Sequence, residues 1–100
     1  MARSTPISVK RALRELGTYL ETWRKLQRLP VATVAERAGL AENTLRKIES
    51  GNGGTSIENV LRVMHVLGIM EPVIKSADPY ITDVGKLRAD EILPQRIRTK

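Results

Sequence analysis

Apolar residues recur at helical spacing in several segments of the chain, and turn-forming residues separate these segments. The first segment, residues 8–28, predicts a long helix that Ser8 caps. Gly17 lowers helix stability there by about 1 kcal/mol relative to alanine, which allows for a helix in two pieces. The pattern ends before Pro30, which suits the first turn of a following helix. The expected buried stripe of the first helix is Val9, Leu13, Leu16, Leu20 and Trp23.

The next segment, residues 31–50, predicts two short helices joined by a tight turn. The first runs to about Ala38, Gly39 makes the turn because glycine adopts a left-handed backbone at little cost, and the second spans about residues 42–49. Ala35 is small enough to let the two helices approach closely. This order of features describes a helix-turn-helix, whose second helix presents its outer face to a DNA major groove. The residues expected inside the angle between the helices are Val34, Ala38, Leu40, Leu45 and Ile48.

Three further helices are predicted after this motif. Ser56 caps the first and Gly68 ends it, and a short helix over residues 71–76 and a last one over residues 83–90 follow. The expected buried stripe of the first is Ile57, Val60, Leu61, Met64 and Leu67. A second apolar edge exceeds what a small domain needs for its own core, so we expect it to contact a second copy or a partner. This edge is Val63, Val66, Met70, Val73 and Ile74.

The composition favours a small cytoplasmic protein that binds a polyanion. Seventeen basic residues against 11 acidic ones give a net charge of +6, which favours nucleic acid, although the same charge also serves solubility. The chain has no cysteine, no apolar run of membrane-spanning length and no signal-peptide core, so no membrane partner is expected. No nucleophile–base pair, phosphate-binding glycine loop or metal-ligand cluster is present. We therefore expect no enzyme activity, no cofactor and no metal, and His65 is expected at the surface.

Three motifs together resemble the Cro and λ-repressor type of helix-turn-helix domain, also called the XRE family: VAERAGL, TLRKIESG and SIENVLRVMHVLG. The resemblance covers about residues 16–67. It implies an all-α fold, namely a five-helix Cro/λ-repressor-like helix-turn-helix bundle with a C-terminal extension. It also implies that Glu49 folds back onto an arginine late in the first helix, which by position is Arg24, in a structural ion pair.

The resemblance further implies a DNA-reading role for the second helix of the motif. In the family, residues near the start of this helix and one turn later read bases, and the matching positions are Glu42, Asn43 and Lys47. These side chains suit cytosine, adenine and guanine respectively, although a carboxylate such as Glu42 also stabilises the first turn of a helix. The positions expected to contact the DNA backbone or the groove wall are Ala32, Thr33, Arg37, Ala41, Thr44, Arg46, Gly51 and Asn52.

The chain departs from the family at the start of the first helix of the motif. Pro30 and Val31 stand where the family often has Ser or Thr and then Gln, residues that cap the helix and bind a phosphate. Only backbone N–H groups, such as those of Ala32 and Thr33, remain to hold a phosphate there.

Together these features predict a flexible N-terminal arm (residues 1–8), a helix-turn-helix DNA-binding domain (9–77) and a C-terminal extension with a basic end (78–100). The extension, DPYITDVGKLRADEILPQRIR, resembles that of HipB-like antitoxins, which bind a HipA-like kinase toxin and repress their own operon. The expected function is therefore a sequence-specific repressor that binds double-stranded DNA as a homodimer, with a HipA-like kinase as a candidate partner. The alternatives are a plain operon or prophage repressor and a mainly protein-interaction module.

Overall fold

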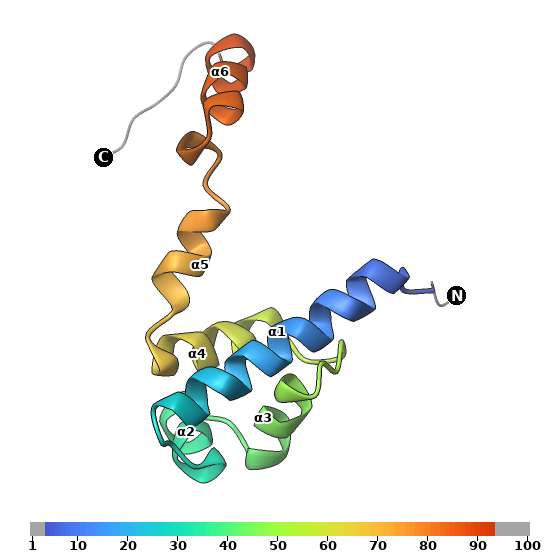
Figure 1. Ribbon diagram of the computed structural model, residues 1–100, viewed down its shortest axis with the longest axis vertical. Helices are drawn as coiled ribbons and strands as arrows, with labels where there is room; N and C mark the ends of the chain where they lie inside the picture. The colour runs from blue at the N-terminus through green and yellow to red at the C-terminus, as the bar shows by residue number, and fades with distance from the viewer. Residues whose placement is uncertain (1–3, 94–100) are drawn as a thin grey trace. The chain divides into compact units, whose positions relative to one another are not determined.

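The computed structural model describes residues 4–93, and all regular structure in this range is helical (Figure 1). This confirms the all-α prediction. No helix in the range is both long enough and apolar enough to cross a membrane. The predicted basic end, residues 95–100, and the first three residues of the predicted arm lie outside the described residues. The elements are α1 (Ile7–Leu26), α2 (Val31–Ala38), α3 (Glu42–Glu49), α4 (Ile57–Leu67), α5 (Met70–Ser76), the 3₁₀ helix η1 (Pro79–Ile81) and α6 (Asp83–Ile92).

The chain divides into two compact units, the first ending at Met70 and the second beginning at Glu71. The division falls inside α5, whereas the sequence placed the domain boundary after residue 77. In the first unit α1 packs against α3 and α4, and α2 packs against the same two helices (Figure 1). The fifth predicted helix forms as α5 but buries none of its residues, so α1–α4 alone make the core. The core residues are Leu20, Val34, Ala35, Leu45, Ile48, Val63, Met64 and Leu67.

The helix-turn-helix forms as the sequence predicts. Helices α2 and α3 have the expected bounds, and Gly39 between them adopts a left-handed backbone with φ 73°. Ala35 is buried, as are four of the five residues expected between the helices, while Leu40 is half-buried. Pro30 precedes α2 as its N-cap instead of lying in its first turn.

The first helix differs from its prediction at both ends and in its middle. It begins at Ile7 with Pro6 as N-cap, so Ser8 lies inside the helix and does not cap it. It is continuous through Gly17, because this glycine is buried where α1 meets α3 and the packing outweighs the low helix propensity. It ends at Leu26, two residues before the predicted end.

Several predicted burial positions are also wrong. Val9 and Ile57 are 47 and 78 % exposed, because the first turns of α1 and α4 extend past the core. Trp23 is 44 % exposed, because it lies at the edge of the core. Val63 was assigned to the partner surface but is only 1 % exposed. Helix α4 packs against both α1 and α2, so it buries a wider apolar face than a single stripe, and Val63 is part of that face.

Four helices of the first unit end in one hydrogen-bonding motif. After α3, for example, the Gly51 N–H donates to the Ile48 carbonyl (3.1 Å) and the Asn52 N–H to the Lys47 carbonyl (2.9 Å). A left-handed residue is required in this motif, and glycine supplies it after α2, α3 and α4. After α1 the position is Arg28, with φ 58°.

The described part of the second unit holds most of α5, then η1 and α6, which pack against each other. Asp78 accepts a hydrogen bond from the Tyr80 N–H (2.9 Å), and Thr82 accepts one from the Gly85 N–H (2.9 Å), so each side chain caps the helix that follows it. Gly85 lies directly against the Pro79 carbonyl, where a Cβ atom has no space. Ala89 is the one buried apolar residue of the part of this unit that the structure describes. Its most exposed apolar residues are Ile74, Ile81, Val84, Leu87, Ile92 and Leu93.

Candidate nucleic-acid interface

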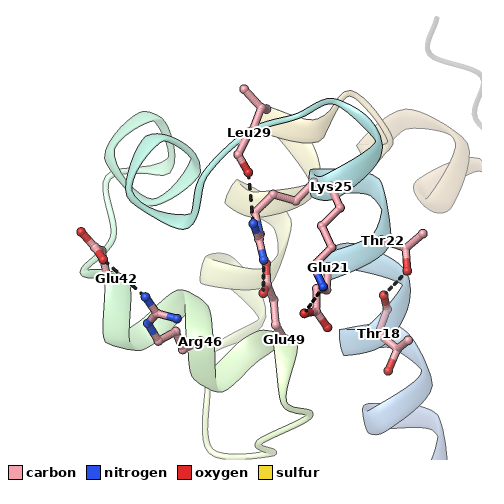
Figure 2. A network of polar contacts seen from close by, with 9 residues as sticks. Thr18, Glu21, Thr22, Lys25, Leu29, Glu42, Arg46 and Glu49 are labelled. Carbon is pink, nitrogen blue, oxygen red and sulfur yellow. Dashed lines mark hydrogen bonds and ion pairs between the residues drawn. The ribbon is translucent and has the colours of Figure 1, made fainter.

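A buried ion pair fixes the C-terminal end of α3. The Arg24 guanidinium donates from Nε to Glu49 Oε2 (2.7 Å) and from Nη2 to Glu49 Oε1 (3.1 Å), and its Nη1 donates to the Leu29 carbonyl (3.1 Å; Figure 2). The two charged side chains are only 11 and 9 % exposed. These bonds raise the pKa of Arg24 above its ordinary value, so the group remains a cation. The pair that the resemblance implies thus joins α1, the α1–α2 connection and α3.

A glycine brings α1 and α3 into backbone contact beside this ion pair. A Cβ atom on Gly17 would meet the carbonyl oxygens of Glu49 and Ile48, the second at 2.7 Å. Real Cβ atoms do not approach other atoms this closely. From helix propensity alone, Gly17 is only a weak point of the helix. Its spacing from Leu13 and Leu20 places it on the buried face, and this periodicity is the feature that points to close packing.

With its inner face held, α3 exposes a polar outer face. Glu42, Asn43, Arg46 and Lys47 are exposed there, while Thr44 is half-buried. Glu42 and Arg46 form an ion pair of 3.8 Å between side chains that are 54 and 62 % exposed (Figure 2). Such an exposed pair contributes about 0.3–0.5 kcal/mol, so both side chains exchange it readily for other partners. The outer face therefore offers hydrogen-bond donors and acceptors of both signs at the spacing of one helical turn.

A family model described as a helix-turn-helix domain matches residues 15–75. The chain belongs to this helix-turn-helix family. The match starts within α1, includes all of α2, α3 and α4, and ends within α5. Membership indicates a DNA-binding regulator. No curated protein and no solved structure matches the chain.

The start of α2 has fewer free hydrogen-bond donors for a DNA phosphate than the sequence predicts. Pro30 provides no side-chain cap, and its carbonyl accepts from the Thr33 N–H (3.1 Å) and the Val34 N–H (3.2 Å). The Thr33 N–H is therefore already used, whereas the Ala32 N–H has no acceptor among the described residues. The Thr33 hydroxyl and Arg37, one turn later, remain side-chain donors on the same face. Ala41 caps α3 with no side-chain hydrogen bond either.

The loop after the recognition helix is ordered by its own hydrogen bonds. Asn52 Oδ1 accepts from the Gly54 N–H (2.7 Å), which leaves the two amide hydrogens of Asn52 as donors. A Cβ atom on Gly51 would lie 2.8 Å from Arg14 Cα, so this loop rests directly on α1. The expected backbone contacts Arg46, Gly51 and Asn52 therefore follow one another along a rigid path.

The residues predicted as a partner surface are divided between the two units. Val63 belongs to the core, and Val66 and Met70 are half-buried at the end of the first unit. Val73 and Ile74 belong to the second unit, where they are 38 and 52 % exposed. His65 is exposed as predicted. Within residues 4–93, no group of His, Cys, Asp or Glu has the arrangement of a metal site.

Proposed function

We propose that this helix-turn-helix protein is a sequence-specific transcriptional repressor that binds DNA as a homodimer and regulates its own operon. The observation that carries the proposal is the exposed polar face of α3 on a helix whose other side is fixed by the Arg24–Glu49 pair and by Gly17. A recognition helix needs this combination, because base reading depends on side chains held in a defined register. The net charge of +6 supplies the attraction to phosphate.

The roles of the α3 side chains follow from their chemistry. Asn43 is suited to bidentate bonding of adenine, Lys47 to the acceptors of guanine, and Glu42 to the amino group of cytosine. Arg46 forms an ion pair with Glu42 and is better suited to binding a phosphate beside the groove than to reading a base. These roles are carried over from the resemblance to Cro and λ repressor. The same resemblance supports the proposal that the chain is a regulator of the XRE type.

A dimer is proposed because one recognition helix reads too few base pairs for high specificity. Two copies place two α3 helices in half-sites about one helical turn apart. The first unit has an apolar surface for this contact: Trp23 and Leu26 are 44 and 68 % exposed near the end of α1, and Val66 is half-buried near the end of α4. A hydrogen bond from Gln27 Nε2 to the Leu67 carbonyl (2.8 Å) holds these two helix ends together. Exposed aromatic side chains of this kind frequently anchor protein interfaces.

The test measures binding to the DNA upstream of the protein's own gene and to a scrambled duplex, over a range of salt concentrations. Lys47→Ala should cost about 1–3 kcal/mol of operator affinity and relax discrimination at one base position. Arg46→Ala should weaken binding to all sequences alike and reduce the salt slope by about 1. Lys86→Ala, which removes an equal charge from α6, is the control. Equal affinity of the wild type for both duplexes, or no effect of Lys47→Ala, would contradict the proposal.

A second candidate function is that of an antitoxin for a HipA-like kinase. It is supported by the second unit, whose described part exposes six large apolar residues, a feature typical of a protein-binding surface. The test is copurification with the product of the neighbouring gene, using wild type and Val84→Asp/Leu87→Asp. These residues are 71 and 60 % exposed, so the variant should fold normally but lose the complex. No complex with the wild type would leave the plain repressor, whereas a complex that the variant leaves unchanged would refute this surface as the site of binding.

A further inference from the structure

The N-terminal part of α1 carries cations that the helix-turn-helix itself does not account for. Lys10 and Arg14 are exposed, and neither pairs with an acidic side chain of the described residues. The family match begins at residue 15, so both cations precede the matched residues. Exposed lysines and arginines usually serve only solubility. The position of these two relative to the recognition helix argues for more.

Lys10 and Arg14 lie on the side of α1 that faces α3. They are one helical turn apart, and the same stripe continues one and two turns later through Gly17 and Glu21. Gly17 touches the α3 backbone, and Glu21 lines a shallow hollow with Arg46, Glu49 and Ser50. The stripe therefore runs alongside the C-terminal half of the recognition helix.

The loop after α3 connects the two sets of cations. Gly51 rests on the backbone of Arg14, and a Cβ atom on Gly53 would lie 3.1 Å from Leu13 Cδ1. Asn52, which directly follows Gly51, thus lies near Arg14, and Lys10 lies one helical turn before Arg14 on α1. The single carboxylate of the stripe, on Glu21, is paired with Lys25 at 3.0 Å, which leaves Arg14 and Lys10 as the unpaired charges of the stripe.

We propose that Lys10 and Arg14 form a phosphate-binding subsite that extends the DNA contact beyond the recognition helix, onto the backbone flanking the half-site. The proposal rests on the DNA-binding function proposed above. Four residues of helix span about 6 Å, which matches roughly two base-pair steps of 3.4 Å along the duplex. A subsite of this kind adds affinity without reading sequence, since phosphates are the same at every base pair.

The test compares the wild type with Lys10→Ala/Arg14→Ala on two duplexes, one with flanking DNA and one that ends at the half-sites. On the long duplex the variant should release two fewer counterions, which makes the salt slope less steep by about 1.8. Its affinity deficit should then shrink about 12-fold between 50 and 200 mM salt. On the short duplex the two proteins should bind alike, and discrimination between operator and scrambled sequence should be unchanged. Lys75→Ala/Lys86→Ala, which removes the same charge from the second unit, is the matched control.

Each outcome distinguishes this subsite from the proposed function. If the wild type prefers its operator but both double variants lose the same affinity on both duplexes, binding responds to net charge and the subsite is refuted while the repressor function stands. An unchanged salt slope for Lys10→Ala/Arg14→Ala refutes the subsite in the same way. If the wild type shows no operator preference, the proposed function fails whatever the variants do. Circular dichroism verifies that the variants keep α1, where alanine favours the helix.

Discussion

The contact between Gly17 and α3 predicts that replacing this glycine with alanine lowers the stability of the protein, whereas the same change in most helices raises it. At an exposed helix position, replacing glycine with alanine stabilises a protein by about 1 kcal/mol. At Gly17 the new Cβ atom would lie 2.7 Å from the Ile48 carbonyl oxygen and 2.8 Å from the Glu49 carbonyl carbon, whereas ordinary contacts begin at 3.4 Å. Helices α1 and α3 must therefore separate by several tenths of an ångström.

The expected magnitude follows from two opposing effects. Overpacking of a core contact costs about 1–3 kcal/mol, and the upper end applies because backbone atoms, unlike side chains, do not rotate away. Subtracting the helix-propensity gain of about 1 kcal/mol leaves Gly17→Ala less stable by about 2 kcal/mol. For a protein of this size, that loss lowers Tm by about 8–16 °C.

The assay is equilibrium unfolding in urea, followed by circular dichroism, with Thr18→Ala as the matched control. Thr18 is the next residue on the same helix and is exposed, so alanine there should be neutral or stabilise by a few tenths of a kcal/mol. A Gly17→Ala protein as stable as the wild type, or more so, would refute the close approach of α1 and α3.

The remaining predictions concern the ion pair and the end of α1. Glu49→Gln should lower the free energy of unfolding by about 3 kcal/mol, because Arg24 is left as a buried, poorly compensated charge. In a double-mutant cycle, Arg24→Met together with Glu49→Leu should cost less than the sum of the single changes, and additive losses would contradict the pairing. Arg28→Gly should raise Tm, since glycine relieves up to about 1 kcal/mol at a left-handed position, and an unchanged or lower Tm would contradict that geometry.

The local features were predictable because their causes lie within a few residues of one another. Gly39, Gly51 and Gly68 mark the ends of α2, α3 and α4, where left-handed backbone is required. Ser56 and Thr82 each accept a hydrogen bond from the N–H three residues later, as helix-capping residues do. The exposed positions of α3 follow from periodicity once its inner face is known.

The errors arise where tertiary contacts outweigh local preference. Gly17 does not break α1, because the backbone of α3 occupies the space of its missing side chain. Val63 is buried because α4 serves two neighbouring helices, which periodicity within one helix does not reveal. Arg28 occupies a left-handed position, which glycine usually marks in a sequence. Because arginine stands there instead, the sequence predicts that residue 28 still belongs to the helix.

Helix α1 is longer than its packing contacts require. Leu20 contributes to the core, while Gly17 and Arg24 hold the C-terminal end of α3 by close packing and by charge. These contacts need only the part of α1 from about Leu13 onward, and the turns before it bury no residue. A solvent-exposed helical extension adds little stability to a small domain, because helices are stabilised chiefly by packing. The extension, which carries Lys10 one turn before Arg14, is therefore better explained by a binding role than by folding, and the salt series on long and short duplexes examines that role directly.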